Sequence, residues 1–379
     1  MPLDFVRKLP DGSVQQKAPE LWNRIHIDPL LMLLVYATLA YGLSVLYSAS
    51  DGQIGYVKRQ LVYAGLGSVA MLVIAQIPLA FVQRWVWLMF LGGVGMLIGV
   101  MFFGTTVNGA KRWLDLGVIA FQPSEVIKLA LPLTLAAYLG RRQLPPSLKH
   151  IFFSLIIVAI PAALIVVQPD LGTSLLVVCS GLVVLFVSGV KWRYWFGAGL
   201  LALGTAPLVW QFALHDYQRG RILTLFNPEA DRLGSGWNII QSMIAIGSGG
   251  MEGKGWLGGT QSQLDFLPES HTDFIIAVLA EEMGFRGVAL LLVLYFCILA
   301  RGLWISYQAK TPFSRLASAA LVVTLFIYIF VNMAMVSGLL PVVGVPLPLV
   351  SYGGTSLLSL FMAFGILMAV ATEEPRLNR

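Results

Sequence analysis

The sequence has 379 residues, of which 57% are hydrophobic and 12% are charged, and its formal net charge is +6. Soluble domains usually carry about 25% charged residues, so this chain cannot cover itself with a water-soluble surface. The positive charge does not indicate a nucleic-acid partner, because the basic residues are scattered between apolar runs, as they are beside membrane helices. Cys179 and Cys297 both lie inside apolar runs, so no disulfide framework is expected.

Ten apolar runs predict membrane-spanning helices, since one span needs roughly 20 apolar residues. We therefore expect an all-α polytopic membrane protein with about ten transmembrane helices. The fourth run is short and the eighth is long, so a shifted boundary or a broken helix is expected at these two. The runs centre on residues 30–47, 61–77, 86–103, 126–139, 151–167, 171–187, 195–212, 274–300, 316–336 and 357–370.

The Lys and Arg residues predict how the chain lies in its membrane. If the N-terminus is inside, 15 of them fall in inner segments and 8 in outer segments, although the outer segments are longer. Cytoplasmic loops of membrane proteins carry such an excess. Both tails, residues 1–28 and 371–379, are therefore expected in the cytoplasm.

The whole chain, residues 1–379, is expected to be a single membrane domain with one large outer loop at 213–272, between the seventh and eighth spans. A connection of this length is uncommon and is usually functional. Its glycine-rich stretch GSGGMEGKG, at 247–255, invites comparison with a phosphate-binding loop, but Ser248 and Gly255 break the spacing of that motif. These glycines are expected to make turns close to the membrane surface instead.

Ionisable residues near span ends are candidates for function, because a charge inside a membrane is costly. Glu125 and Lys128 stand three residues apart at the start of the fourth span, so they share a helix face. They could line a cavity, or they could be a pair that neutralises itself and so lowers the cost of insertion. Asp170, between the fifth and sixth spans, is expected to cap the positive end of the sixth helix.

Asp273 lies where the large loop meets the eighth span. We expect it at the N-cap, where the helix amides would lower its pKa and keep it ionised. A catalytic base needs the same ionised form. Further along this helix, Arg286 follows Glu282 by four residues and can neutralise it. With 3.6 residues per turn, no basic residue of the same helix falls beside Glu281. Glu281 is therefore the second carboxylate of interest.

The last outer loop, residues 338–356, contains Pro341, Pro346 and Pro348 and almost no polar side chains. Apolar, non-helical backbone at membrane depth must be covered by protein or line a cavity. We expect a re-entrant loop here, with residues 351–354 opening the tenth helix.

Six sequence segments stand out together: GAKRWLDLG (109–117), FQPSEVIK (121–128), QPDLGTS (168–174), HDYQRGRI (215–222), GKGWLGGTQSQLDFLPESHTDF (253–274) and PLPLVSYGGTS (346–356). In this order they closely resemble the SEDS family (shape, elongation, division and sporulation), the membrane glycosyltransferases that polymerise peptidoglycan. The segment GTQSQLDFLPE resembles that of the elongation members, which maintain rod shape, rather than that of the division members.

The resemblance implies polymerisation of lipid II into glycan strands at the outer face of the bacterial cytoplasmic (inner) membrane. In that family the aspartate of the HTDF segment is required for activity, which here is Asp273. The family's polar pair in the fourth span corresponds to Glu125 and Lys128. Transfer to a C4 hydroxyl with inversion needs one base on the acceptor side, and Asp273 suits that role.

Substrate-binding residues are expected on the outer side, because a pyrophosphate leaving group needs positive charge more than a proton donor. The candidates, in addition to Glu125 and Lys128, are Lys111, Arg112, Arg219, Arg221, Lys254 and Glu281. A divalent cation such as Mg or Mn could share this role, although no ligand cluster in the sequence demands a metal.

Two other functions fit parts of the sequence. A lipid II flippase would explain Glu125 and Lys128 equally well, but it explains the large loop and Asp273 less well. A scaffold for a transpeptidase is the third interpretation. The resemblance also implies a partner within the elongation machinery, a class B penicillin-binding protein with transpeptidase activity. Residues 338–348 and the eighth and ninth spans are the candidate contact surfaces.

Overall fold

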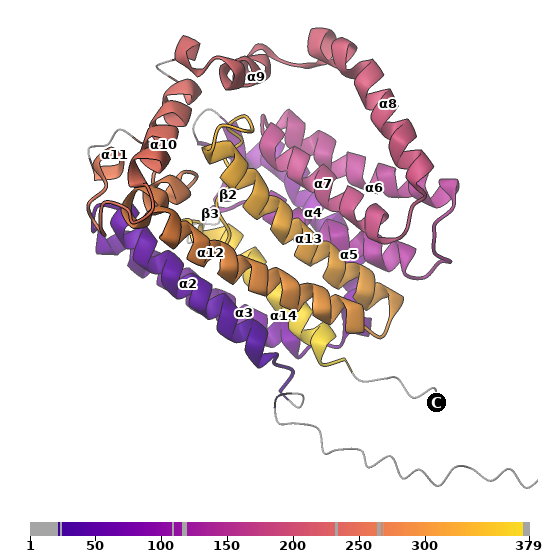
Figure 1. Ribbon diagram of the computed structural model, residues 1–379. Coiled ribbons are helices and arrows are strands. Elements are labelled where there is room, and N and C mark those ends of the chain that lie inside the picture. Colours follow the sequence, from indigo (N-terminus) through magenta and orange to yellow (C-terminus); the bar gives the residue numbers. More distant parts are fainter. Residues whose placement is uncertain are drawn as a thin grey trace, which may run out of the picture.

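Long apolar helices packed side by side make up most of the protein (Figure 1). The structure is a computed structural model, and it describes residues 22, 25–107, 110–115, 120–231, 234–263, 267 and 269–373. Within these residues helices greatly outnumber strands, and the longest helices are strongly apolar. The prediction of a polytopic helical membrane protein is therefore confirmed.

Ten helices coincide with the ten predicted spans. They are α2 (Pro29–Ala49), α3 (Ile54–Ala75), α4 (Leu79–Phe103), α5 (Pro123–Leu139), α6 (Leu148–Val167), α7 (Leu171–Val187), α8 (Trp192–Leu208), α12 (Ile275–Gln308), α13 (Pro312–Val336) and α14 (Gly354–Ala371). By length and composition, eight helices of the described residues can cross a membrane, α8 being extended by the π-helix η1 (Val209–Ala213). The others, α5 and α7, have 17 residues each. The number of ten spans stays a prediction.

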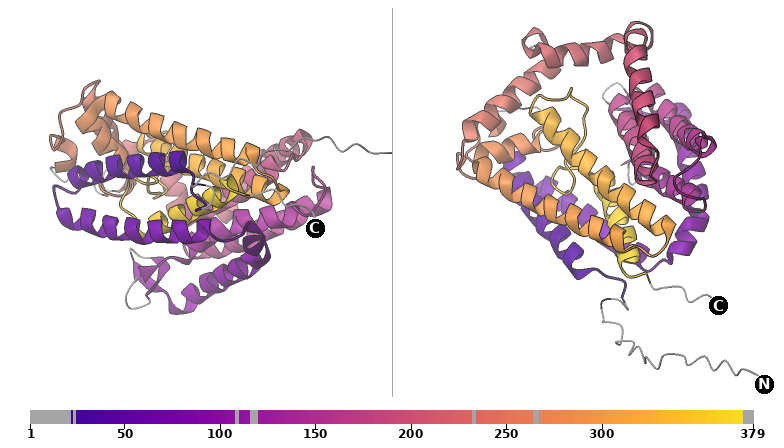
Figure 2. Two further views of the ribbon diagram at one scale, coloured as in Figure 1. Left: turned by 90° about the horizontal axis from the view of Figure 1, so that it is seen from below. Right: turned by 45° about the vertical axis from the view of Figure 1, so that its right-hand side comes forward.

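The first and last of these helices share one end of the bundle. Helix α2 begins near the end of α14, as Figure 1 and the right-hand view of Figure 2 show. A hydrogen bond joins the two segments, since His26 Nδ1 and Thr372 Oγ1 lie 3.0 Å apart. This arrangement fits termini on one side of a membrane. Most of the predicted tails, residues 1–21, 23–24 and 374–379, lie outside the described residues.

The predicted large loop at 213–272 is mostly helical. It contains α9 (Asp216–Phe226), the 3₁₀ helix η2 (Pro228–Asp231), α10 (Ser235–Gly249) and α11 (Thr260–Gln263). Figure 1 shows these elements as an arc from the upper end of α8 to the beginning of α12. The sequence was polar and rich in glycine, but it did not predict this helical content.

A small antiparallel sheet precedes α5, which the all-helical expectation missed. Its strands are β1 (Thr105–Val107), β2 (Ala110–Asp115) and β3 (Ala120–Phe121), in that spatial order. The sheet brings Arg112 of β2 next to the turn between α6 and α7.

The helices differ greatly in how much of them is buried. More than half of the apolar window of α13 and of α14 is buried, whereas none of that window of α8 is. Phe196, Leu200 and Leu203 on α8 are each more than 70% exposed. Apolar side chains exposed over a whole helix are suited to lipid. Helix α8 thus lies at the periphery, whereas α13 and α14, with the largely buried α5, lie at the centre.

Helix α12 is broken near its beginning. Its 34 residues would make a continuous helix about 51 Å long, compared with a hydrocarbon core of about 30 Å. Gly284 has φ 62° and ψ −161°, a conformation that is essentially restricted to glycine. The expectation of a broken eighth helix is confirmed. The break separates a short first piece, residues 275–283, from the longer remainder.

Candidate active site

Asp273 lies in a turn, residues 269–274, that leads into α12, and the backbone of this turn is fixed by hydrogen bonds. The three successive carbonyls of residues 271–273 each accept one bond. The donors are the backbone N–H of Tyr352 at 2.9 Å, the hydroxyl of Ser351 at 2.5 Å and the side-chain amide of Asn332 at 2.9 Å. The backbone at Asp273 therefore cannot move without α13 and the loop that follows it.

That loop, residues 338–353, is non-helical, as predicted, and protein buries its residues 345 and 347–351. Asn332 donates its second bond to the carbonyl of Val345 at 2.6 Å, and the hydroxyl of Ser351 accepts from the N–H of Leu347 at 2.8 Å. Gly344 has φ 79°, and a Cβ built on it would lie 3.4 Å from Asp273 Oδ2. The carboxylate of Asp273 thus lies directly against the backbone of this loop, where a larger side chain would crowd it.

The surroundings of Asp273 raise its pKa from 3.8 to about 6. Burial is the main cause, the carboxylate of Glu269 adds to the rise, and the guanidinium of Arg221 opposes it. The expectation that Asp273 caps the helix with a lowered pKa is wrong. Phe274 occupies the N-cap position and no side chain caps α12. Without that cap, the cost of burying the charge dominates.

Arg221, on α9, is the predicted cation that acts electrostatically on Asp273. It donates one hydrogen bond to the carbonyl of Val342 at 3.2 Å, so it also contacts the 338–353 loop. A guanidinium has five donors. The remaining donors leave Arg221 able to bind an anion beside Asp273.

The other outer cations of the prediction differ in their partners. Arg112 forms an ion pair with Asp170 at 3.7 Å and donates to the carbonyls of Gln168 and Pro169. Arg219 pairs with Asp216 at 3.7 Å. The side chain of Lys111 is exposed and has no ion pair or hydrogen bond with the described part of the chain. The proposed substrate-binding role of these three residues is a prediction that the geometry leaves open.

Lys254 and Glu281, both predicted to bind substrate, contact each other instead of lying free. Lys254 Nζ is 2.6 Å from Glu281 Oε1, and the side chain of Glu281 is fully buried. The same carboxylate accepts the backbone N–H groups of Thr260 and Gln261. Glu281 therefore has no partner in its own helix, as expected, but it has four donors in the 213–272 segment.

The predicted pairing of Glu282 with Arg286 is wrong. Arg286 forms an exposed ion pair with Glu252 at 3.1 Å, and Glu282 accepts a hydrogen bond from the hydroxyl of Ser48 at 2.6 Å. The break at Gly284 lies between the two residues, so they lose the geometry of neighbours four apart on a helix.

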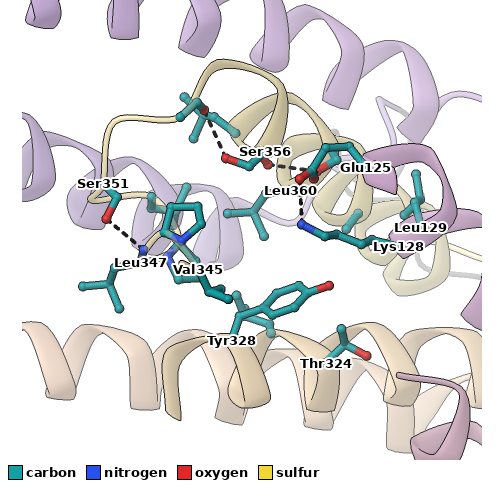
Figure 3. Close-up of a pocket in the computed structure, with 18 of the residues that line it drawn as sticks. Glu125, Lys128, Leu129, Thr324, Tyr328, Val345, Leu347, Ser351, Ser356 and Leu360 are labelled. Atoms are coloured by element: carbon teal, nitrogen blue, oxygen red, sulfur yellow. Dashed lines mark hydrogen bonds and ion pairs between the residues drawn. The ribbon is translucent and has the colours of Figure 1, made fainter. Parts of the chain in front are cut away.

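Glu125 and Lys128 form the predicted pair on one face of α5. Lys128 Nζ lies 2.6 Å from Glu125 Oε1, and the hydroxyl of Ser359 donates to Glu125 Oε2 at 2.8 Å. Lys128 also lies 5.6 Å from the ring centre of Tyr328 (Figure 3). The hydroxyl of Tyr328 is buried without a hydrogen-bond partner in the described structure. The pair is thus neutralised, as one interpretation held, and still faces open space.

This open space is a groove of about 720 Å³, including its open side, between α5, α13, α14 and the 338–353 loop. Its walls are mostly leucine, valine and proline, and its polar end carries Glu125 and Lys128 (Figure 3). Asp273 does not line it, but Ser351 does, and Ser351 is bonded to the residue before Asp273. One loop therefore separates the groove from the carboxylate.

Asp170 caps α7 as predicted, since its carboxylate accepts the N–H of Thr173 at 3.1 Å. The prediction of turns holds for three of the five glycines of 247–255, because Gly250, Gly253 and Gly255 have positive φ, whereas Gly247 and Gly249 belong to the last turn of α10. Among the described residues, no group of three or more His, Cys, Asp or Glu side chains is placed to hold a metal ion.

Sequence reasoning missed several residues that position Asp273. Asn332 was detectable, because an amide inside an apolar run must find partners. Gln60 was not, although it is buried and bonds both the carbonyl of Ser351 and the N–H of Gly353. The ring of Tyr56, on α3, lies 4.8 Å from that of His271 and 5.3 Å from that of Tyr352. These contacts join segments far apart in sequence.

Known proteins match this chain over nearly its whole length. Peptidoglycan glycosyltransferase MrdB of Escherichia coli K12 is 50% identical over 358 residues, which cover 94% of this chain and 97% of MrdB. A probable peptidoglycan glycosyltransferase FtsW of Trichlorobacter lovleyi is 36% identical over 91% of this chain and 93% of its own length. The higher identity to MrdB, which is RodA, confirms the predicted elongation type.

Solved structures of related proteins have the same fold as this chain. The rod shape determining protein RodA of Thermus thermophilus superposes with a TM-score of 0.68 at 29% identity, over 90% of this chain and 95% of that chain. A chain from a peptidoglycan synthase complex that coordinates polymerization and crosslinking gives a TM-score of 0.80 at 32% identity, over 90% and 96%. The family model described as cell cycle protein, FtsW/RodA/SpoVE, matches residues 28–376. The chain belongs to this FtsW/RodA/SpoVE family.

Proposed function

We propose that this chain is a peptidoglycan glycosyltransferase that polymerises lipid II at the outer face of the bacterial cytoplasmic membrane during cell elongation and rod-shape maintenance. The relative MrdB, 50% identical, bears the name peptidoglycan glycosyltransferase. The observation that carries the proposal is the state of Asp273, a partly buried carboxylate on a fixed turn with a pKa of about 6. Such a group is ionised near neutral pH and still accepts a proton readily, which is what a general base needs.

Asp273 acts on the acceptor in this proposal. Its carboxylate takes the proton of the acceptor C4 hydroxyl while the oxygen attacks the anomeric carbon of the donor. The bond from that carbon to the lipid pyrophosphate breaks, and the pyrophosphate leaves with the electron pair. The attack comes from the face opposite the leaving group, so the anomeric centre is inverted and a single base suffices.

Arg221 is the proposed contact for the leaving pyrophosphate. It acts on Asp273 electrostatically, so it is near the reacting atoms. A guanidinium can also donate two parallel hydrogen bonds to two oxygens of one phosphate. The side chains of Lys58 and Arg59, exposed in the second turn of α3, make no ion pair or hydrogen bond with the described residues and can also bind the pyrophosphate. They belong to the same helix as Tyr56, which contacts His271.

A lipid II flippase is the second candidate, and the groove beside Glu125 and Lys128 favours it. A polar patch at the end of an apolar groove could guide a head group through a membrane. Purified protein in detergent distinguishes the two functions, because no bilayer is present to flip across. Glycan strands formed from labelled lipid II, resolved by length on a gel, support the glycosyltransferase. Unchanged lipid II, with lipid transport in proteoliposomes, would support the flippase.

A transpeptidase partner, a class B penicillin-binding protein, belongs to the same proposal. The structural neighbour from a peptidoglycan synthase complex supports it. Exposed aromatic side chains on α12 and α13, such as Phe296, Phe326 and Phe330, offer an apolar contact within the bilayer, and residues 338–348 add a contact at its surface. Both termini are proposed to be cytoplasmic and the 213–272 segment outside, on the Lys and Arg asymmetry.

A further inference from the structure

The break in α12 is filled by another segment of the chain. Residues 250–255, from the glycine-rich stretch, lie alongside residues 281–286 and bond to their backbone. The N–H groups of Lys254 and Gly255 donate to the carbonyls of Glu281 and Glu282 at 3.0 and 2.9 Å. In return, the N–H of Phe285 donates to the carbonyl of Gly250 at 2.9 Å. The hydrogen bonds that the helix loses at its break are thus replaced.

Two glycines permit this close approach. A Cβ on Gly284 would lie 2.4 Å from the backbone nitrogen of Gly253, and a Cβ on Gly253 would lie 2.1 Å from the carbonyl oxygen of Glu282. Both glycines also have positive φ. The two backbones therefore touch in a way that no other residue type would allow at these positions.

Glu281 ties the same two segments together through its side chain. Its carboxylate accepts from Lys254 Nζ at 2.6 Å, from the hydroxyl and N–H of Thr260 at 2.9 and 2.8 Å, and from the N–H of Gln261 at 3.1 Å. The residue is fully buried. A buried carboxylate needs such a complete set of donors. The side chain thus binds residues 254–261 to the end of the short helical piece 275–283.

The short piece connects Glu281 to Asp273. Residues 275–282 are all buried, so the piece has no free surface along which to slide. The seven helical residues 275–281 span about 10 Å along the axis between this turn and Glu281. A displacement at Glu281 is therefore passed to the turn that holds Asp273.

We propose that Glu281, together with Lys254, is a positioning element that fixes the turn carrying Asp273 through the short piece 275–283. It does not touch the substrate in this account. The proposal rests on the proposed function, in which Asp273 is the base. It replaces the sequence-based view that Lys254 and Glu281 bind substrate.

The test compares purified variants in the lipid II polymerisation assay. Glu281→Gln keeps the shape of the side chain but removes the charge that holds Lys254. We expect kcat to fall by about 10 to 100-fold, because a small misplacement of a catalytic group has effects of this size. KM should stay within about twofold, since the substrate contacts are intact. Glu252→Gln is the matched control, because the exposed Glu252–Arg286 pair joins the same segments without burial.

The pH profile separates positioning from general loss of folding. The charged groups that act on Asp273 are Glu269 and Arg221, and His271 is in the same turn. If the turn loosens, water reaches Asp273 and its pKa falls from about 6 toward 3.8, so the acid limb of the rate profile moves to lower pH. A purely structural role would reduce the amount of active protein and leave the acid limb in place.

Three outcomes would overturn the proposal. They are an unchanged kcat in folded Glu281→Gln, a raised KM with unchanged kcat, and a lower kcat with the acid limb unmoved. If Glu281→Gln does not fold, two other variants take its place. One is the single variant Lys254→Met, and the other is the double variant that carries both Lys254→Met and Glu281→Gln. The double variant should then be more stable than the single one, because it leaves no unpaired buried charge. Failure of the proposed function would show separately, as an active Asp273→Asn variant.

Discussion

The polymerisation rate should depend on pH through Asp273, with an acid limb near pH 6. The base works only when ionised, and burial has raised its pKa to about 6. Roughly 10% of such a group is ionised at pH 5 and roughly 90% at pH 7. The value of kcat/KM should therefore fall about tenfold from pH 7 to pH 5. An aspartate with the ordinary pKa of 3.8 would be more than about 90% ionised at both.

Two variants should move this limb in opposite directions. Glu269→Gln removes the carboxylate that raises the pKa of Asp273, so the limb should move to lower pH. Arg221→Gln removes the guanidinium that lowers that pKa, so the limb should move to higher pH. Arg221→Gln should also lower kcat, because it removes the proposed pyrophosphate contact.

The assay is initial-rate polymerisation of fluorescent lipid II by purified protein from pH 4.5 to 8.5. Protein incubated at each pH and returned to pH 7.5 controls for irreversible unfolding. A flat profile between pH 5 and 7, with folded protein throughout, would refute the reasoning. So would a shift of the limb in the same direction for both variants, because their charges have opposite signs.

Three further predictions concern the membrane part and its partner. Neutralising Glu125 or Lys128 alone, as Glu125→Gln or Lys128→Met, should destabilise the protein more than both changes together, and additive effects in thermal unfolding would show that the pair does not interact. In a background without Cys179 and Cys297, an impermeant thiol reagent should label Asp216→Cys in intact spheroplasts and Ser147→Cys only after permeabilisation, whereas the reverse pattern would invert the orientation. A tagged class B penicillin-binding protein should co-purify with this chain and raise its polymerisation rate, and no association with no change in rate would mean that the chain acts alone.

The spans were predictable from sequence because the membrane constrains each helix through residues that are close together in the sequence. Backbone groups in lipid must bond within their own segment, so each span shows as a continuous apolar run. All ten runs became helices. The pairing of Glu125 with Lys128 and the cap by Asp170 were predictable for the same reason, since each involves residues three apart.

The environment of Asp273 was not predictable in this way. Its pKa depends on burial under the 338–353 loop and on Arg221, and both are distant in sequence. The expected bond between Glu282 and Arg286 failed because it assumed an unbroken helix. Gly250, Gly253 and Gly255 were correctly assigned to turns, but the sequence did not reveal that these turns fill the break at Gly284.

Polymerisation by purified Asp273→Asn protein tests the central claim most directly. The substitution keeps the shape of the side chain and removes the base, so the rate should fall by about 100 to 10,000-fold. Folding should not suffer: ionising a carboxyl whose pKa is raised costs stability above about pH 6, and the variant avoids that cost. Glu269→Gln, in the same turn, serves as the control and should remain active at pH 7.5. An Asp273→Asn enzyme with more than half of the normal rate would contradict the assignment of Asp273 as the base.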